Sequence, residues 1–206
     1  MSLVNVNDEP QLIAAALHGK LDAFNQLVLI YQDTVYTLAY RVMGEPDSAA
    51  DATQETFISA YRNLSSYRGG NFKSWLLRIA TNTCYDELRR RKRRPATPIE
   101  ELPGSESDDG PPLVSTAVTP EEAAQQSELT SAIQECINNL QPDYRVTLVM
   151  SDIEGFNYQE IAEQTSVPPG TVKSRLSRAR LAMRRCLEGV QELLPAEFRL
   201  KYNNEP

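Results

Sequence analysis

Apolar side chains recur along the first half of the chain at the spacing of an α-helix. Between residues 24 and 42 they fall three or four positions apart, on one face of a long helix. A glycine and a proline at positions 44 and 46 end this run, and a second run covers residues 49–64. A third helix is expected over residues 72–94, because Pro95 disfavours helix in the residue before it.

The same period returns in the last third of the chain. Leu129, Ile133, Ile137 and Leu140 form one stripe, and a shorter helix is expected over residues 144–153. Two further short helices follow across a tight turn. No run alternates as a strand would, and no internal repeat is found. The sequence therefore predicts an all-α protein with two small helical domains.

The segment between these helical regions has a different composition. Residues 95–120 hold six prolines and two glycines, with few bulky apolar side chains. Such a segment cannot bury enough apolar surface to offset the entropy lost on ordering, so a flexible acidic linker is expected. The predicted division is a first domain at 1–94, a linker at 95–121, a second domain at 122–194 and a C-terminal tail at 195–206.

The last pair of short helices has the pattern of a helix-turn-helix. Asn157 can cap the first helix, with Glu160 as its capping-box partner, and Pro168, Pro169 and Gly170 then interrupt it. The second helix carries six basic residues and no acid up to position 186: Lys173, Arg175, Arg178, Arg180, Arg184 and Arg185. A basic second helix suits the major groove of DNA. The competing interpretation is a solvated basic face on an ordinary helical hairpin.

Net charge alone argues against a nucleic-acid partner, but its distribution argues for one. The 206 residues carry a formal charge of −7, whereas phosphate contacts need Lys and Arg. Residues 68–94 hold nine basic residues against two acids, and residues 95–144 hold ten acids and no base. Two cationic regions separated by an anionic segment are not typical of a uniformly solvated surface.

The first cationic region combines positive charge with aromatic rings. Aromatic faces stack on unpaired bases while Lys and Arg follow the backbone, so the mixture favours single-stranded nucleic acid. Asn82 lies seven residues after Trp75, on nearly the same helix face, and its amide can bind a base edge. Leu76 and Ile79 are better explained as core residues. The candidate residues are Tyr67, Arg68, Phe72, Lys73, Trp75, Arg78 and Asn82.

Other chemistry has little support in the sequence. The cysteines at positions 84, 136 and 186 are far apart and lack metal-binding spacing, which predicts reduced thiols rather than disulfides or a zinc site. No run approaches the roughly eighteen apolar residues of a membrane span, and no signal peptide is expected at the N-terminus. No catalytic, metal or cofactor site is predicted, and the expected location is cytoplasmic.

Three motifs occur in an order that resembles one known family. They are Asp51-Ala-Thr-Gln-Glu55-Thr-Phe57, Phe72-Lys-Ser-Trp75-Leu-Leu-Arg-Ile-Ala80-Thr-Asn82 and Gly170-Thr-Val-Lys-Ser-Arg175-Leu-Ser-Arg178. Together they resemble the extracytoplasmic-function (ECF, or group IV) sigma factors of bacterial RNA polymerase, over essentially the whole chain. The resemblance implies a promoter-specificity subunit, not an enzyme.

The resemblance also implies which surfaces meet which partners. Asp51, Gln54 and Glu55 match the position that binds the β′ clamp of core polymerase, and the β subunit is a further expected contact. The loop before Trp75 would capture a base flipped from the −10 element and help to melt DNA. The linker matches a segment that passes through the polymerase active-site cleft, and many family members also bind an anti-sigma factor. The −35 element would meet Thr171, Lys173, Ser174, Arg175, Ser177 and Arg178.

Two positions depart from the family pattern. Ser177 stands where some members have a bulky aromatic residue, and Ser151 where a basic residue often approaches DNA. Base-by-base promoter specificity is therefore not transferred.

Two rival functions fit part of the chain. A stand-alone helix-turn-helix regulator accounts for residues 156–186 but leaves the first cationic region and the linker unexplained. A metal-dependent enzyme could use Asp47, Asp51 and Glu55 on one helix face, but no second acidic helix completes such a site.

Overall fold

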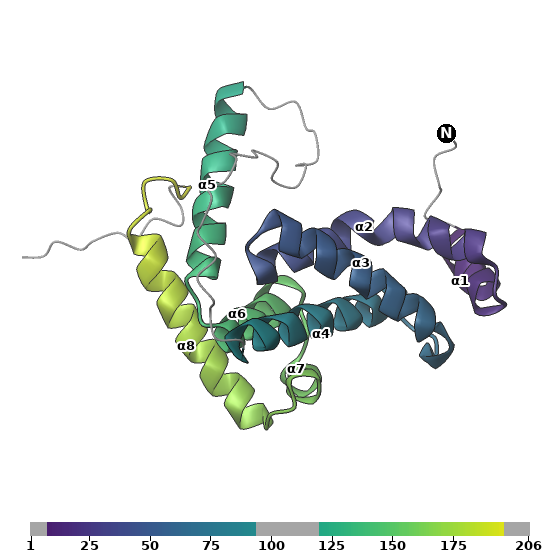
Figure 1. Ribbon diagram of the computed structural model, residues 1–206. Coiled ribbons are helices and arrows are strands. Elements are labelled where there is room, and N and C mark those ends of the chain that lie inside the picture. Colours follow the sequence, from purple (N-terminus) through teal and green to yellow (C-terminus); the bar gives the residue numbers. More distant parts are fainter. Residues whose placement is uncertain (1–7, 94–119, 196–206) are drawn as a thin grey trace, which may run out of the picture. The chain divides into compact units, whose positions relative to one another are not determined.

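Residues 8–93 and 120–195 are described by the computed structural model, and their regular elements are all helical. The helices labelled in Figure 1 are α1 (Glu9–Leu17), α2 (Leu21–Met43), α3 (Pro46–Arg62), α4 (Phe72–Arg93), α5 (Pro120–Asn138), α6 (Pro142–Leu148), α7 (Tyr158–Thr165) and α8 (Pro169–Glu188). A 3-10 turn, η2 (Leu64–Ser66), and a π-helical turn, η3 (Val149–Ile153), complete them. No strand occurs in these two ranges, so the all-α prediction is confirmed. None of the described helices is both long and apolar enough to cross a membrane.

The chain divides into two compact units, with the boundary between Arg91 and Lys92. Unit 1 contains α1, α2, α3 and nearly all of α4, and unit 2 contains α5 to α8. Two helical units agree with the predicted fold. The predicted linker up to residue 119 and the tail after residue 195 lie outside the described residues, so the finer domain limits stay a prediction.

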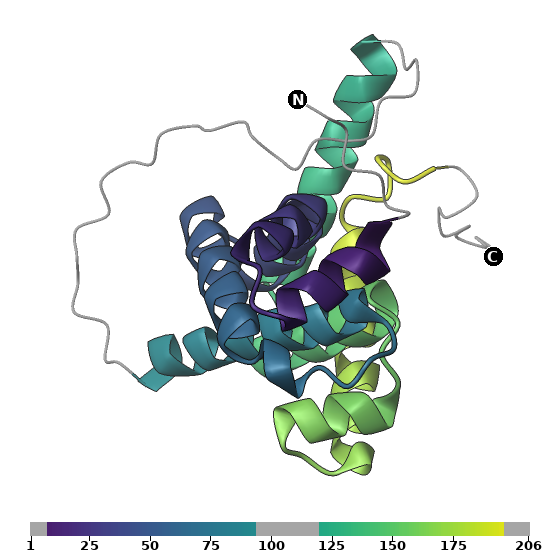
Figure 2. The ribbon, with the colours of Figure 1, turned by 90° about the vertical axis from the view of Figure 1, so that its right-hand side faces the viewer.

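Unit 1 is built on the apolar stripe of α2. Leu27, Val35 and Leu38 are at most 1% exposed, and α3 packs against α2 with the fully buried small residues Ala49 and Ala60. Small side chains at a contact let two helices approach closely. Figure 2 shows α2 and α3 (both purple to blue) side by side, and α1 packs on α2 as well.

The corner between α2 and α3 follows from local chemistry. Gly44 adopts a left-handed conformation (φ 81°) after Met43, and its N–H donates to the carbonyl of Tyr40 at 2.8 Å. A left-handed residue at a helix end favours glycine. Pro46 then takes the first position of α3, where a backbone N–H has no partner within the helix. The predicted stop at positions 44 and 46 is confirmed.

Unit 2 has a core formed by α6, α7 and α8. Val146, Ile161 and Val172, one from each helix, are fully buried. Beyond Leu148 the helix continues through the π-helical turn η3, and Gly155 follows it with φ 74°. The sequence predicted one helix over residues 144–153, and the structure has helix over this range. The π-helical form of the last turn was not predicted.

The helix-turn-helix is formed by α7 and α8. The side chain of Asn157 accepts the N–H of Glu160 at 3.0 Å, and the Glu160 carboxylate accepts the N–H of Asn157 at 2.9 Å, which is the predicted capping box. α7 already ends at Thr165, and Ser166 takes a left-handed conformation (φ 54°) before the prolines are reached. α8 then begins at Pro169.

The prediction of three reduced thiols is wrong for two of the cysteines. Cys136 of α5 and Cys186 of α8 form a disulfide, with Cα atoms 5.7 Å apart at a sequence separation of 50. Spacing along the chain could not show this pair, because it is the packing of α5 against α8 that brings the two residues together. Cys84 is a free thiol buried in unit 1, and its burial raises its pKa to about 12.

Candidate nucleic-acid interface

The loop between η2 and α4 is shaped by two glycines. Gly69 and Gly70 adopt left-handed conformations (φ 91° and 92°) that residues with a Cβ rarely take. The hydroxyl of Tyr67 donates to the carbonyl of Gly70 at 2.6 Å and closes the loop. The side chain of Asn71 accepts the N–H of Ser74 at 2.9 Å, which caps the start of α4. The loop therefore has a defined shape directly before the first turn of α4.

Three aromatic rings pack together at this loop. Ring centroids are 5.5 Å apart for Tyr67 and Trp75, 5.3 Å for Phe72 and Trp75, and 5.4 Å for Tyr67 and Phe72. Phe72 is only 2% exposed and also contacts Tyr31 of α2, at 5.7 Å between centroids. Its ring is therefore not available to a base and acts as a support for the other two. Tyr67 and Trp75 are half-buried, so each keeps some surface.

The other candidates of unit 1 are polar and lie nearer to solvent. Arg68, Lys73 and Asn82 are exposed, and Arg78 is half-buried. Asn82 stands about 10 Å along the axis of α4 from Trp75, because seven residues of α-helix rise roughly that far. The structure thus gathers cations, aromatic rings and an amide on one loop and the first turns of α4.

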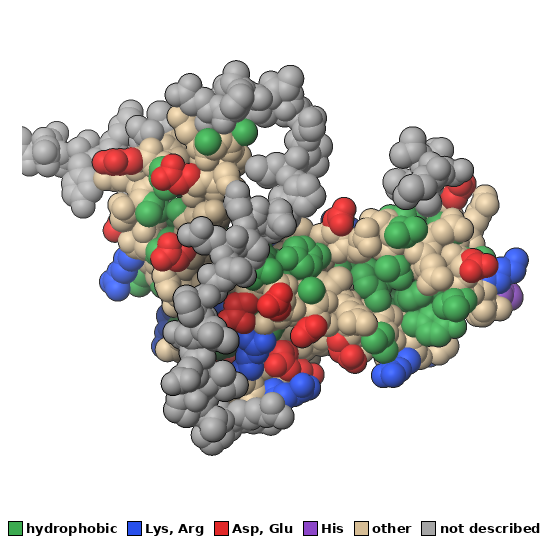
Figure 3. Space-filling model, turned by 45° about the horizontal axis from the view of Figure 1, so that its top comes forward, with side chains coloured by type: hydrophobic (Ala, Val, Ile, Leu, Met, Phe, Trp, Pro, Cys, Tyr) green, Lys and Arg blue, Asp and Glu red, His purple; other side chains and the backbone are tan. Residues whose placement is uncertain are grey.

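The candidate core-binding residues lie on the exposed face of α3. Asp51, Gln54 and Glu55 are exposed, whereas Ala52 and Thr56 are at most 5% exposed. The three candidates line a polar cleft of about 680 Å³ between α3 and α4. Its α4 wall is formed by Thr83, Glu87, Arg90 and Arg91. Both signs of charge therefore meet in this cleft, and Figure 3 shows acidic (red) and basic (blue) side chains close together at the surface of the molecule.

An ion-pair network ties α4 to the start of α3. The guanidinium of Arg91 donates to Glu45 at 3.1 Å, to Ser48 at 2.6 Å and to Glu87 at 3.3 Å. The sequence had shown only a run of basic residues at this place. Arg91, one member of that run, therefore joins α4 to the start of α3.

On α8 most of the candidate −35 residues are exposed. Lys173, Ser174, Ser177 and Arg178 are exposed, and Thr171 is half-buried. The hydroxyl of Ser174 donates to the carbonyl of Thr171 at 2.9 Å, within the first turn of the helix. These five residues form an accessible polar strip on the second helix of the helix-turn-helix.

Arg175 differs from its neighbours. Its side chain is 16% exposed, and its guanidinium donates to the carboxylate of Asp143 in α6 at 2.8 Å. Arg178, one turn later, remains exposed and donates to the hydroxyl of Tyr144 at 3.3 Å. Arg175 therefore joins α8 to α6, although the sequence placed it with the DNA-contacting residues.

A second ion pair joins α8 to η3, and the sequence analysis missed it. The guanidinium of Arg180 donates to both oxygens of Asp152, at 2.9 and 2.7 Å, and this hydrogen bonding lowers the pKa of Asp152. A sequence signal for this ion pair was available. The basic segment 171–186 has no acid of its own, and acids at positions 143 and 152 precede it. Such a helix needs acidic partners wherever it packs.

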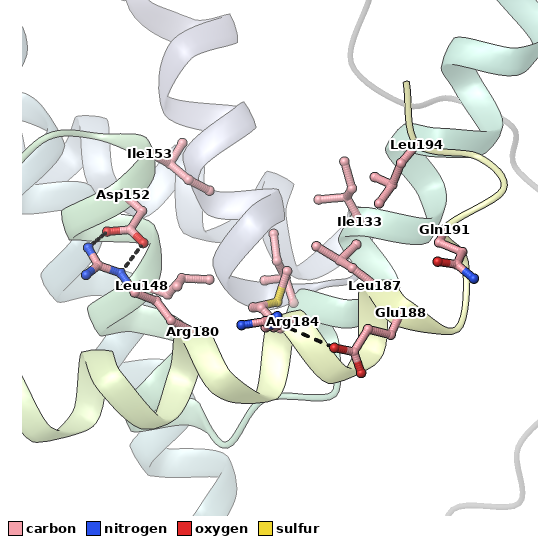
Figure 4. A pocket seen from close by; sticks show the side chains of 12 residues that line it. Ile133, Leu148, Asp152, Ile153, Arg180, Arg184, Leu187, Glu188, Gln191 and Leu194 are labelled. Atoms are coloured by element: carbon pink, nitrogen blue, oxygen red, sulfur yellow. Dashed lines mark hydrogen bonds and ion pairs between the residues drawn. The ribbon is translucent and has the colours of Figure 1, made fainter. Parts of the chain in front are cut away.

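Unit 2 also contains an apolar groove of about 590 Å³, shown in Figure 4. Its apolar walls come from α5, α6, η3 and α8: Ile133, Ile137, Leu148, Ile153, Met183 and Leu187. The Arg180–Asp152 pair and an Arg184–Glu188 pair (3.5 Å) border it, and both appear as dashed lines in Figure 4. The sequence did not predict this groove, because its walls come from four separate elements.

Two family models match the chain, one within each helical region. They are Sigma-70 region 2 at residues 27–94 and Sigma-70, region 4 at residues 130–183. The ECF RNA polymerase sigma factor SigW of Bacillus subtilis is 39% identical, over 82% of this chain and 91% of its own. The RNA polymerase sigma-H factor of Pseudomonas aeruginosa is 34% identical, over 90% of this chain and 97% of its own. The chain belongs to the ECF sigma factors of the sigma-70 family.

A solved structure shows a related fold. The sigma factor RpoE of Bartonella quintana, in complex with the anti-sigma factor NepR, superposes with a TM-score of 0.59 and is 25% identical, covering 81% of this chain and 98% of that one. The chain is accordingly an RNA polymerase sigma factor, which binds core polymerase and directs it to promoter DNA. The resemblance seen in the sequence is confirmed, and the stand-alone regulator is set aside. The family is a class of transcription initiation factors that act with RNA polymerase in the cytoplasm.

Proposed function

We propose that unit 1 reads and opens the −10 element through the surface of the α4 loop and the first turns of α4. Tyr67 and Trp75 would stack on a flipped base, and Asn82 would bind its edge. The observation that carries this proposal is the combination of a glycine-shaped loop, two half-buried rings supported by Phe72, and an exposed amide on the same helix. Arg68, Lys73 and Arg78 would follow the backbone of the single strand.

The test is promoter opening by holoenzyme that contains an Asn82→Ala variant. Permanganate reactivity of unpaired thymines should fall on duplex promoters and be largely restored on premelted ones, because the amide acts in capturing the extruded base. Gln26→Ala, an exposed amide on α2 outside the proposed surface, is the matched control and should behave as wild type. Equal reactivity in Asn82→Ala and wild type on duplex DNA would exclude this role.

We propose that α8 reads the −35 element in the major groove through Thr171, Lys173, Ser174, Ser177 and Arg178. These residues are exposed or half-buried on the second helix of a helix-turn-helix, the element that enters the groove in such proteins. Arg175 takes a different part in this proposal. Through its ion pair with Asp143 it positions α8, and its own contact with DNA is secondary.

For core polymerase we propose the face of Asp51, Gln54 and Glu55 as the contact with the β′ clamp. Its support is geometric: these polar side chains point away from the buried Ala52 and Thr56 and line a cleft with polar walls. The β subunit is a second proposed contact, together with the linker at 95–121. We further propose that the chain acts in the cytoplasm without enzymatic activity of its own, and with domain limits of 1–94 and 122–194.

An anti-sigma factor is a further proposed partner. The Bartonella relative of 25% identity was solved in complex with one. Co-purification from cells of the native host, followed by identification of bound chains, would test this. The expected result is a protein that competes with core polymerase, and a complex that leaves core binding unchanged would count against it.

A further inference from the structure

The disulfide of unit 2 joins α5 to α8. On each helix it lies between a firmly anchored part and a weakly anchored part. Cys136 is 2% exposed on α5, and Cys186 is half-buried two residues before the end of α8. Between them in the sequence lie α6, η3, α7 and most of α8, so the bond encloses the whole helix-turn-helix. The covalent link therefore joins the two ends of the region that carries the −35 surface.

α5 has few other attachments on the N-terminal side of the disulfide. The guanidinium of Arg145 donates to the carbonyls of Asn138 and Leu140, which holds the last turn of α5 and the residues after it. Before Cys136, the one buried side chain among the described residues of α5 is Gln134, and residues 123–128 are all exposed. Figures 1 and 2 show this part of α5 (teal) extending beyond the other helices of unit 2.

α8 is likewise anchored differently along its length. Up to residue 180 it is held by the buried side chains of Val172 and Leu176 and by the two ion pairs of Arg175 and Arg180. From residue 181 to residue 188 no side chain is fully buried. The disulfide is thus the strongest attachment of the second half of α8.

Residues on both sides of the disulfide, on α5 and on α8, are also walls of the apolar groove. Ile133 and Ile137 flank Cys136 on α5, and Met183 and Leu187 flank Cys186 on α8. The bond therefore fixes the separation of two groove walls. The exposed strip from Thr171 to Arg178 depends on other anchors.

We propose that Cys136 and Cys186 form a reversible thiol–disulfide modification site, whose oxidation state sets how firmly the groove walls are held while the DNA-facing half of α8 is left unchanged. Disulfides in a compartment that keeps thiols reduced are usually transient and redox-sensing. A role in redox regulation rests on the cytoplasmic location proposed above. The thiol–disulfide exchange of the pair does not depend on that location.

The chemistry is exchange with a small dithiol. Its thiolate attacks Sγ of Cys186, the less buried of the two residues, which forms a mixed disulfide and releases Cys136 as a thiolate that takes up a proton. The second thiol of the dithiol then attacks the mixed disulfide and releases Cys186 as a thiol. The dithiol leaves as a disulfide, so two electrons and two protons have moved to the protein. Cys84, with no partner cysteine and a fully buried sulfur, takes no part.

Thiol mapping tests the pair directly. The full chain, purified without reductant, is incubated with increasing dithiothreitol, alkylated in the native state and digested for mass spectrometry. We expect Cys136 and Cys186 to resist alkylation without dithiothreitol and to become labelled together over one range of its concentration, while Cys84 is labelled only after denaturation. Labelling of Cys136 and Cys186 in the untreated protein would overturn the proposal.

Hydrogen exchange tests the consequence. Amides at 123–137 and 183–194 should exchange about tenfold faster, or more, in the reduced protein, while those at 158–180 should not change. A Cys136→Ser/Cys186→Ser variant should match reduced wild type with or without dithiothreitol, and Cys84→Ser should respond as wild type does. Equal exchange in both oxidation states, or an increase that includes residues 158–180 to the same degree, would show that the bond is not a local control of the groove.

Discussion

Replacing Arg175 with alanine should destabilise unit 2 without changing which bases of the −35 element are preferred. The reason is its position, because its guanidinium is paired with Asp143 at 2.8 Å and its side chain is 16% exposed. Neighbouring Arg178 has the same chemical group but is exposed. The two arginines therefore form a matched pair, one structural and one available to DNA.

The size of the effect follows from the exposure of the two partners. Breaking a fully buried ion pair by removing one member costs about 3–5 kcal/mol, and an exposed pair contributes at most about 1 kcal/mol. Arg175 is 16% exposed and Asp143 is 39% exposed, so a loss between these limits, about 2 kcal/mol, is expected. For a domain of this size that corresponds to a fall in Tm of roughly 8–16 °C.

Two measurements separate stability from readout. Calorimetric unfolding of the full chain should show the lower Tm in Arg175→Ala and a near wild-type Tm in Arg178→Ala. A double-mutant cycle with Asp143→Ala should give a coupling free energy of about 1 kcal/mol or more. Holoenzyme binding to single-base variants of the −35 element should then relax discrimination at one position in Arg178→Ala, at a cost of about 1–3 kcal/mol on the preferred sequence.

The opposite pattern would exchange the roles of the two arginines. If Arg175→Ala kept its Tm and lost discrimination at one base pair, Arg175 would be a base-reading residue and its pairing with Asp143 would be incidental. If Arg178→Ala weakened binding to all sequences equally, Arg178 would contact phosphate and carry no base specificity.

Two further perturbations concern the core-binding face of α3 and the ion pair between α8 and η3. Replacing Asp51 and Glu55 together with arginine should weaken core-polymerase association by at least about tenfold, because opposite charge would replace the proposed contact face, and unchanged far-UV circular dichroism would show that the fold is kept. Wild-type affinity in this variant would remove the face from the proposed interface. The pKa of Asp152 is lowered by its hydrogen bonds from Arg180, so the stability from this pair is present above the ordinary aspartate pKa of about 3.9 and is lost as the pH falls below it. In acid titrations followed by unfolding, Asp152→Asn should flatten this loss, and identical profiles in the two proteins would contradict it.

Features set by neighbouring residues could be predicted from the sequence. The stop at Gly44 and Pro46 and the capping box of Asn157 and Glu160 both depend on contacts within a few residues, and the structure has them as expected. The helical period likewise sufficed for α2 to α8 and for two units, whereas α1 (Glu9–Leu17) was not predicted. The family motifs added the function, which spacing alone left open between a regulator and a sigma factor.

Features set by packing between distant segments could not be predicted. The disulfide of Cys136 and Cys186 and the ion pair of Arg175 and Asp143 depend on how α8 meets α5 and α6. Residue type gave no sign of either contact, because a cysteine without a nearby partner suggests a free thiol and a basic residue on a helix does not show which carboxylate it meets. Phe72 belongs to the same group, since its burial under the α4 loop is a property of the assembled unit.

Run-off transcription measures whether this chain directs core polymerase to promoters. Core RNA polymerase free of other sigma factors is incubated with this chain and a library of promoter fragments, and the transcripts are sequenced together with the fragments that produced them. We expect transcripts with defined start sites, formed only when both core polymerase and the chain are present, from fragments that share one −10 and one −35 element. Sequence-specific DNA binding by the chain alone, with no transcript that depends on it in the presence of core polymerase, would mean that the chain does not act as a sigma factor.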